Sequence, residues 1–229
     1  MSLENVTLGE YEVLETLGLD GLQIVQDTRL YRFTSDSVLL SRFARAKNGD
    51  KVADFCSGSG IVAFHFHALH KDKGLTFTLF EMQRCLSDLS KKTIELNGFE
   101  NFTVENQKVQ DIPSSFAGAF SLALCNPPYE RGGLENDDYH KAVCRKEITV
   151  NLKEIALAAT KILKYGGRFC MVHRADRLAE ICYTLKECDL EVKRLRFVTG
   201  KKGKEPYLVL VEAVKGGKPC VKIEEEEIN

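Results

Sequence analysis

The sequence predicts an α/β domain built around a mostly parallel sheet. Between residues 49 and 126, short apolar runs alternate with helical stretches, which is the pattern of parallel strands joined by crossover helices. Four successive strand-like stretches lead to polar residues, and the carboxyl ends of parallel strands meet at one edge of a sheet. Two later runs, 195–198 and 207–211, flank a turn and predict an antiparallel pair at the edge of the sheet.

Residues 1–48 predict an N-terminal extension that packs on the core. Two apolar runs, 22–25 and 30–33, are spaced as a hairpin. A helix is expected over 37–46, and the hydroxyl side chain of Thr34 stands where a helix N-cap is needed. We expect that Thr34 can also receive the carboxylate of a cofactor bound at the sheet edge.

Residues 49–223 predict the main domain, which opens with a strand over 51–55, a glycine turn and a helix over 61–70. Backbone in such a turn can approach a nucleotide-type ligand closely. The turn is not the dinucleotide fingerprint, because it lacks a third glycine at the required spacing. Its D-x-x-x-G-x-G form suits a ligand with an amino acid group, whose ammonium would lie near Asp54. The predicted ligand contacts in the turn are Cys56, Ser57, Gly58 and Gly60.

The strands that follow place further polar residues at the same edge. Glu81 ends the run 75–80 and is placed to accept hydrogen bonds from two ribose hydroxyls. The run 102–109 leads to Asp111, which could accept a hydrogen bond from an adenine amino group. The predicted cofactor contacts also include Met82, Ile112, which could pack against the adenine ring, and Asn126, which follows the run 120–125. Singly, each acid is typical of a helix N-cap or a solvated loop, but their order along the chain favours a ligand site.

The sequence Asn126-Pro127-Pro128-Tyr129 predicts a reaction at a planar nitrogen. An amine conjugated to a ring or a carbonyl is a poor nucleophile, and two carbonyl acceptors for its N–H bonds can restore its lone pair. The Asn126 side-chain oxygen and the Pro127 carbonyl could supply them, and the two prolines hold that carbonyl rigidly. Tyr129 would stack on the planar group. The alternative is that the prolines simply end a strand.

The rest of the domain continues the α/β pattern. A helix over 84–96 closes at Asn97-Gly98, a pair typical of a C-cap. Residues 130–144 carry glycines and aspartates and predict a loop beside the active site. The remaining elements are expected over 148–163 (a helix closed by Gly166-Gly167), 169–173 (a strand) and 177–188 (a helix).

Composition narrows the classes of protein. The 229 residues are enough to bury a full core, and we expect one domain. No run reaches the roughly 18 apolar residues of a membrane span, and no signal-peptide pattern opens the chain. The eight cysteines lack zinc-ligand spacing, so we expect reduced thiols, a cytoplasmic protein and no metal.

His65, His67 and His70 do not share one helix face, and Cys125 has no local catalytic partner. Oligomeric state leaves no signal in the sequence.

Charge gives no global attraction to nucleic acid, since the net charge is −1. Residues 224–229 predict a solvated acidic tail, and without its four glutamates the net charge would be +3. Local basic clusters therefore carry the prediction of a phosphate-binding surface, although each is also typical of a solvated turn. The predicted substrate contacts are Arg145, Arg174, Lys201, Lys202 and Lys204. Arg29, Arg32, Arg42, Arg131 and Arg177 could extend that surface.

Together these motifs resemble the S-adenosylmethionine-dependent methyltransferases, in their amino-methylating N-P-P-Y branch. Segments 34–40, 145–148, 173–178 and 203–212 narrow the resemblance to the tRNA adenine-N6-methyltransferases that modify valine tRNA beside the anticodon. The resemblance covers about residues 15 to 223. Departures are Lys146, where that family often has His, and Cys56, where it often has Gly or Thr.

The resemblance implies a Rossmann-like methyltransferase fold, with a mostly parallel seven-stranded sheet, an antiparallel edge and helices on both faces. It also implies S-adenosyl-L-methionine as cofactor and a tRNA as partner. Asn126, Pro127, Pro128 and Tyr129 would then be the catalytic residues. Three alternatives stay open: methylation of a glutamine side chain in a release factor, methylation of guanine N2 in ribosomal RNA, and a non-catalytic scaffold.

Overall fold

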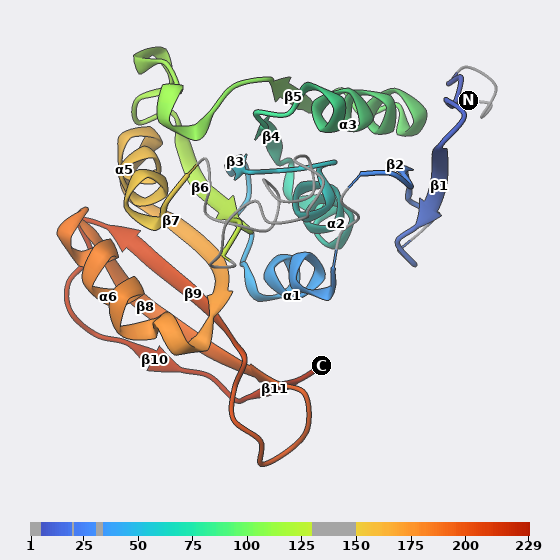
Figure 1. Ribbon diagram of the computed structural model, residues 1–229. Coiled ribbons are helices and arrows are strands. Elements are labelled where there is room, and N and C mark those ends of the chain that lie inside the picture. Colours follow the sequence, from blue (N-terminus) through green and yellow to red (C-terminus); the bar gives the residue numbers. More distant parts are fainter. Residues whose placement is uncertain (1–5, 20, 31–33, 130–149) are drawn as a thin grey trace.

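The computed structural model describes residues 6–19, 21–30, 34–129 and 150–229. A sheet runs through the centre of the molecule (Figure 1). Among the described residues, nine strands form this sheet. They are β3 (Lys51–Phe55), β4 (Thr76–Phe80), β5 (Phe102–Glu105), β6 (Phe120–Cys125), β7 (Leu163–Arg174), β8 (Leu190–Thr199), β9 (Leu208–Lys215), β10 (Lys222–Ile223) and β11 (Glu227–Ile228). Their order is β10-β8-β9-β7-β6-β3-β4-β5, with β11 also paired to β8.

Strand directions confirm the predicted fold class. The neighbours from β5 across β4, β3 and β6 to β7 are all parallel. Only β9 runs against its neighbours β7 and β8 in the described part of the sheet. Because β8 therefore runs in the same direction as β7, the turn after β8 lies at the same edge as the carboxyl ends of β3 and β6.

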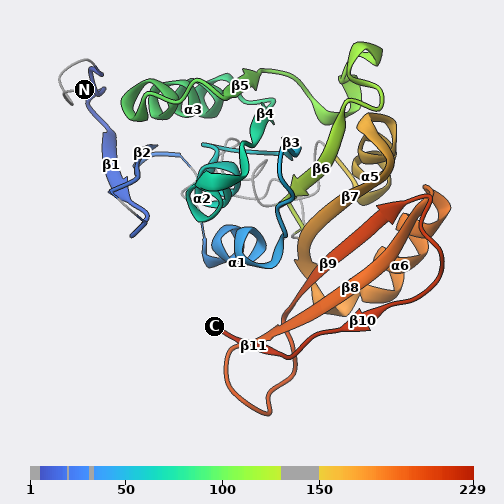
Figure 2. The same ribbon diagram turned by 180° about the vertical axis from the view of Figure 1, so that it is seen from behind.

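Helices cover both faces of the sheet (Figures 1 and 2). The described helices are α1 (Ser35–Phe43), α2 (Ile61–Leu69), α3 (Arg84–Asn97), α5 (Leu152–Ile162) and α6 (Leu178–Glu187). Alternate residues of a strand point to opposite faces. In β3, Val52 joins the apolar cluster under α1 and α2, whereas Ala53 and Phe55 join the cluster under α5 and α6. The Asp54 side chain consequently points toward α2.

The N-terminal extension contains a hairpin that the sequence does not predict. β2 (Gln23–Asp27) pairs antiparallel with β1 (Glu12–Thr16), while residues 31–33 of the predicted partner run 30–33 lie outside the described residues. The apolar pattern misses β1 because its residues are mostly polar and half-exposed. The hairpin packs on α3, where the Val25 N–H donates to Thr93 Oγ1 at 3.0 Å.

Several element boundaries also differ from the sequence predictions. The helix expected over 148–163 begins at Leu152, where Asn151 and Glu154 form a reciprocal capping box, and it ends at Ile162. Gly166-Gly167 does not close it, because β7 already starts at Leu163 and passes through both glycines in an irregular stretch of its pairing with β6. The strand expected over 102–109 ends at Glu105 and is followed by a short 3-10 helix, Val109–Asp111.

The acidic tail is part of the sheet rather than a solvated terminus. β10 and β11 both pair parallel with β8, outside the strands of the predicted sheet. Glu224, between them, accepts hydrogen bonds from Arg45 at 2.9 Å, Arg194 at 3.0 Å and Arg196 at 2.8 Å. Its side chain is only 9% exposed. The prediction of a solvated tail is therefore wrong for Glu224, although Glu225 and Glu226 are exposed.

Candidate active site

The glycine turn after β3 has the backbone conformation that its glycines permit. Gly58 and Gly60 have φ values of +57° and +84°, where residues with a side chain are strained. A Cβ atom at Gly60 would lie 2.4 Å from the Phe64 ring and 2.8 Å from Leu79, so the turn also needs glycine there for space. A Cβ at Gly58 would meet nothing within 4 Å. The backbone at Gly58 is thus open on one side.

Cys56 and Ser57 join β3 to this turn. Cys56 has a φ of +52°, an uncommon conformation for a residue other than glycine. The Ser57 N–H donates to the Phe80 carbonyl at 3.2 Å, which ties the turn to the end of β4. The Ser57 hydroxyl oxygen is buried without a hydrogen-bond partner among the described residues. A buried polar atom in this state is a candidate ligand contact.

Asp54 is a fully buried carboxylic acid at the end of β3. Its Oδ2 accepts a hydrogen bond from the Ala63 N–H at 3.2 Å, near the start of α2. Within the part of the chain that the structure describes, its Oδ1 has no hydrogen-bond partner. Burial raises the pKa of Asp54 to about 8, and the neighbouring Glu81 carboxylate acts in the same direction. A cationic group beside Oδ1 would offset both effects.

Glu81 clamps the glycine turn to the end of β4. Its Oε2 accepts from the Gly58 N–H and its Oε1 from the Gln83 N–H, each at 2.8 Å. The residue is 5% exposed, and burial raises the pKa of its carboxyl group. Asn106, which the sequence patterns do not single out, donates to the Glu81 and Met82 carbonyls at 2.8 and 3.1 Å. Asn106, which directly follows β5, therefore fixes the backbone of Glu81 and Met82, two of the predicted cofactor contacts.

The two residues predicted to contact adenine differ in exposure. Asp111 is exposed at the end of its 3-10 helix. Ile112 is 1% exposed and belongs to the core cluster under α5, where its carbonyl accepts from Lys161 Nζ at 2.6 Å. Asp111 is accessible to a ligand, while Ile112 has little free surface.

Asn126 follows β6 at the same edge of the sheet as the glycine turn. Cys125 is the register partner of Phe55, so Asn126 stands level with Cys56 on the neighbouring strand. Its Nδ2 donates to Ser37 Oγ at 3.0 Å, an atom from the first turn of α1. Asn126 is half-buried, and the two prolines after it are buried. Among the described residues, the Asn126 side-chain oxygen Oδ1 accepts no hydrogen bond.

Tyr129 is held from two sides. Its hydroxyl donates to the Asp36 carboxylate, also in the first turn of α1. Its ring lies 5.5 Å from the His173 ring, centroid to centroid, at an angle of 48°. Burial lowers the pKa of His173 to about 4, with a further lowering by Arg177, so the imidazole beside Tyr129 is neutral near pH 7. Asp36 and His173 lie in the segments 34–40 and 173–178 that carry the family resemblance, but no residue spacing predicts their contacts with Tyr129.

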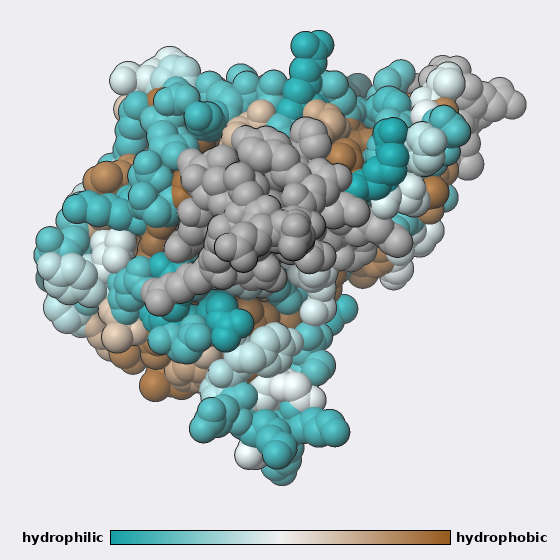
Figure 3. Space-filling view, in the orientation of Figure 1, coloured by the Kyte–Doolittle hydropathy of each residue, from teal (hydrophilic) through white to brown (hydrophobic). Residues whose placement is uncertain are grey.

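The predicted substrate contacts lie apart from the buried site. Lys201, Lys202 and Lys204 are exposed in the turn between β8 and β9, a hydrophilic projection at the bottom of Figure 3. Arg174 is half-exposed at the end of β7 and pairs with Asp176 at 3.2 Å. Arg145 lies outside the described residues. By topology, the β8–β9 turn and Arg174 share the edge that carries Asn126.

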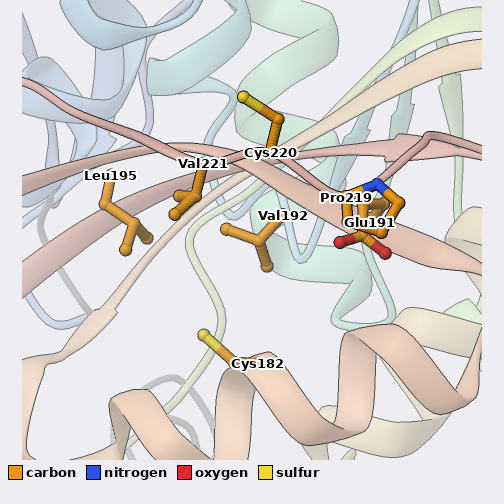
Figure 4. A pocket seen from close by; sticks show the side chains of 7 residues that line it. All are labelled: Cys182, Glu191, Val192, Leu195, Pro219, Cys220 and Val221. Carbon is orange, nitrogen blue, oxygen red and sulfur yellow. The ribbon is translucent and has the colours of Figure 1, made fainter.

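A pocket of about 540 Å³ lies elsewhere, between α6, β8 and the segment before β10 (Figure 4). No predicted site residue lines it. Its lining residues are Cys182, Glu191, Val192, Leu195, Pro219, Cys220 and Val221. In the described ranges, no group of three His, Cys, Asp or Glu side chains could hold a metal ion. Nor is any described helix both long and apolar enough to cross a membrane.

Known proteins resemble this chain over most of its length. The family model described as "Methyltransferase small domain" matches residues 34–197. A Shewanella sediminis protein named tRNA1(Val) (adenine(37)-N6)-methyltransferase is 21% identical over 76% of this chain and 72% of its own length. A Pectobacterium carotovorum protein of the same name is 22% identical over 90% of this chain and 85% of its own length. The crystal structure of P. horikoshii TYW2 in complex with MeSAdo has a TM-score of 0.62 at 14% identity, and covers 92% of this chain and 74% of that one.

Proposed function

This chain belongs to the methyltransferase small domain family and is an S-adenosyl-L-methionine-dependent methyltransferase, and we propose that it forms N6-methyladenosine beside the anticodon of a tRNA. The observation that carries the proposal is the position of Asn126. Its side-chain oxygen has no partner among the described residues, and it stands one strand away from the glycine turn. A planar amine and a methyl donor would meet between them.

The residues at the sheet edge fit this cofactor. The unpartnered Asp54 Oδ1 suits the ammonium of its amino acid group, and Ser57 Oγ is a second unsatisfied group in the same turn. Glu81 is oriented by two backbone N–H groups and suits the ribose hydroxyls. Thr34 makes no side-chain cap bond to α1, which leaves its hydroxyl for the carboxylate. Cys56, Gly58, Gly60, Met82 and Asp111 complete the proposed contacts, and Ile112 contributes from the core.

Bound S-adenosyl-L-methionine supplies an activated methyl group, so the chain needs to align and polarise the acceptor. The Asn126 Oδ1 and the Pro127 carbonyl would accept the two N–H bonds of the adenine amine and return its lone pair to the nitrogen. Pro128 keeps the carbonyl rigid, and Tyr129 would stack on the base. An adenine in a loop leaves its stack at a cost of only a few kcal/mol.

The tRNA substrate is supported by the names of the relatives and by the exposed lysines at the same edge. Lys201, Lys202, Lys204 and Arg174 would meet phosphate groups, and Arg145 is proposed to join them. Phosphate contacts would position the RNA without reading its sequence. A tRNA substrate would also place the enzyme in the cytoplasm.

Mass spectrometry of nucleosides tests the proposal directly. The full chain is incubated with S-adenosyl-L-methionine and unmodified valine tRNA, and the digested RNA is analysed. N6-methyladenosine is the expected product. N2-methylguanosine formed on ribosomal RNA, or a methylated glutamine in a release-factor peptide, would overturn the substrate assignment while keeping the methyltransferase.

The Asn126→Ala variant is the matched control for that assay. We expect it to abolish methyl transfer while the affinity for S-adenosyl-L-methionine, measured by calorimetry, stays within about tenfold. Full activity in this variant would contradict the assigned role of Asn126. A wild-type chain that does not bind the cofactor would favour a scaffold.

A further inference from the structure

The first turn of α1 contacts both ends of the Asn126–Tyr129 segment. Ser37 Oγ accepts a hydrogen bond from Asn126 Nδ2 at 3.0 Å, and the Asp36 carboxylate accepts one from the Tyr129 hydroxyl. These contacts join residues 89 and 93 positions apart in the chain. Local sequence patterns cannot reveal them, because α1 precedes the whole parallel sheet.

We propose that Ser37 is a positioning residue, which orients the Asn126 side-chain amide so that its oxygen rather than its nitrogen faces the substrate amine. The inference rests on the proposed function, because it concerns the same methyl transfer. It adds a residue outside the Asn-Pro-Pro-Tyr sequence to the machinery that makes the amine nucleophilic.

The two ends of a side-chain amide are similar in size but opposite in hydrogen bonding. The oxygen accepts, whereas the nitrogen has two N–H donors. A half-turn of the amide would direct the NH2 group at the incoming amine, so that donors faced donors and the amine lone pair stayed delocalised. The reaction therefore needs one of two orientations of nearly equal shape. A serine hydroxyl can donate as well as accept, so Ser37 favours the productive orientation through the arrangement seen in the structure, in which its oxygen accepts from Nδ2.

Ser37 is well held for this purpose. It is 6% exposed, and its N–H donates to the Thr34 carbonyl at 3.2 Å at the start of α1. Four residues later, Ser41 Oγ lies 2.7 Å from His65 Nδ1, which fixes α1 against α2. In the described ranges, Ser37 is the one hydrogen-bond partner found for the Asn126 side chain. Loss of its hydroxyl would let the amide sample both orientations.

The test compares Ser37→Ala with Ser37→Thr and with the matched control Ser41→Ala, which removes a buried hydroxyl from the same helix. We expect Ser37→Ala to lower kcat about 30-fold, less than the roughly 100- to 1,000-fold loss seen when a hydrogen-bonding group at the reacting atoms is itself removed, because Ser37 acts through Asn126. The KM for tRNA and the cofactor affinity should stay within about threefold. Ser37→Thr keeps the hydroxyl and should recover most of kcat, and Ser41→Ala should keep wild-type kcat. Thermal melting of all three confirms that they are folded at the assay temperature.

Unchanged kcat in a folded Ser37→Ala variant would overturn the proposal. A raised KM with unchanged kcat would do so too, because that pattern indicates lost binding rather than lost orientation. If the wild type methylates a peptide amide or guanine instead of tRNA, the proposed substrate fails, and the same variants are compared on that substrate. Wild-type inactivity on all three substrates would overturn this inference together with the proposed function.

Discussion

Buried charge is handled in opposite ways at the two ends of the sheet. Among the C-terminal strands, which form one lateral edge of the sheet, Arg194 pairs with Glu212 at 2.9 Å and with Glu224 at 3.0 Å. At the carboxyl ends of β3 and β4, the buried acids Asp54 and Glu81 accept only backbone N–H groups among the described residues. The buried charge among the C-terminal strands is cancelled within the described chain, whereas Asp54 and Glu81 have no cationic partner there, as the proposed binding of a cationic, hydroxyl-bearing ligand requires.

The pKa shifts follow the same division. Burial raises the pKa of Asp54 and of Glu81, because neither acid has a cationic partner in the described chain. Burial also acts to raise the pKa of Glu224, but hydrogen bonds from Arg196 and Arg194 outweigh it and hold that pKa below its ordinary value. Substitutions at the two ends should therefore separate stability from ligand binding.

The largest effect on stability is expected from Gly60→Ala, which changes the glycine turn between Asp54 and α2. The new Cβ would lie 2.4 Å from Phe64, at a φ of +84°. Strain and overpacking together should lower the free energy of unfolding by about 3 kcal/mol or more, as measured by urea denaturation. Gly58→Ala is the control: its φ is also positive, but a Cβ there has open space, so we expect a loss of about 1 kcal/mol. Equal losses would show that crowding at Gly60 is unimportant.

The next effect is expected from Glu81→Gln at the open end. The amide keeps the size of the side chain but loses the charge that would accept from ribose hydroxyls. We expect the affinity for S-adenosyl-L-methionine to fall between about 10-fold and 100-fold, the range for hydrogen bonds to a charged group. Stability should fall by about 1 to 3 kcal/mol, because the new NH2 group would face one of the two backbone N–H donors that Glu81 accepts. A variant that binds the cofactor normally would contradict the role of Glu81.

Glu224→Gln is the counterpart at the paired end. It leaves three guanidinium groups without their shared carboxylate, although Arg45 remains 61% exposed and can be hydrated. We expect a loss of about 1 to 3 kcal/mol in unfolding free energy, with cofactor affinity unchanged in calorimetry. Weakened cofactor binding by this variant would show that the pairs of Glu224 and the proposed cofactor site are energetically coupled, contrary to our expectation.

The smallest effect is a pH dependence that belongs to Asp54. Because its folded pKa of about 8 lies above its ordinary value, the folded state holds the proton more tightly, and this group's contribution to stability falls as pH rises from about 4 to about 8. An ammonium beside Asp54 would favour the carboxylate. Cofactor affinity should therefore rise about fivefold from pH 7 to pH 8, with release of up to about one proton.

Calorimetry in buffers of different ionisation enthalpy measures the released proton. Asp54→Asn is the control and should bind with little dependence on pH over this range. A wild-type affinity that does not change with pH, or that falls, would place the ammonium away from Asp54.

Sequence patterns predict the region around Asp54 and Glu81, where the buried acids have no cationic partner among the described residues, better than the region around Glu224, where the charges are paired. The strand, the glycine turn and the helix after Asp54 are local features, so each residue type and spacing is visible in about 20 positions of sequence. The contacts of Glu224 join residues 28, 30 and 179 positions apart, and no local pattern records them. The same reason hides the contact between Ser37, which belongs to the segment 34–40 used for the resemblance, and Asn126, because the two residues lie 89 positions apart. The strand β1 was missed because its half-exposed sequence lacks the apolar pattern of a core strand.

The backbone hydrogen bonds to Glu81 limit how many further donors its carboxylate can accept from a ligand. The Gly58 and Gln83 N–H groups each occupy a lone pair on one oxygen of Glu81, and the Met82 N–H also favours its charged form. Few acceptor positions therefore remain, and two adjacent hydroxyl groups of a ligand would use them. A sugar that presents a single hydroxyl would leave a buried acceptor of Glu81 unsatisfied. Deoxy analogues of the methyl donor should therefore bind with lower affinity.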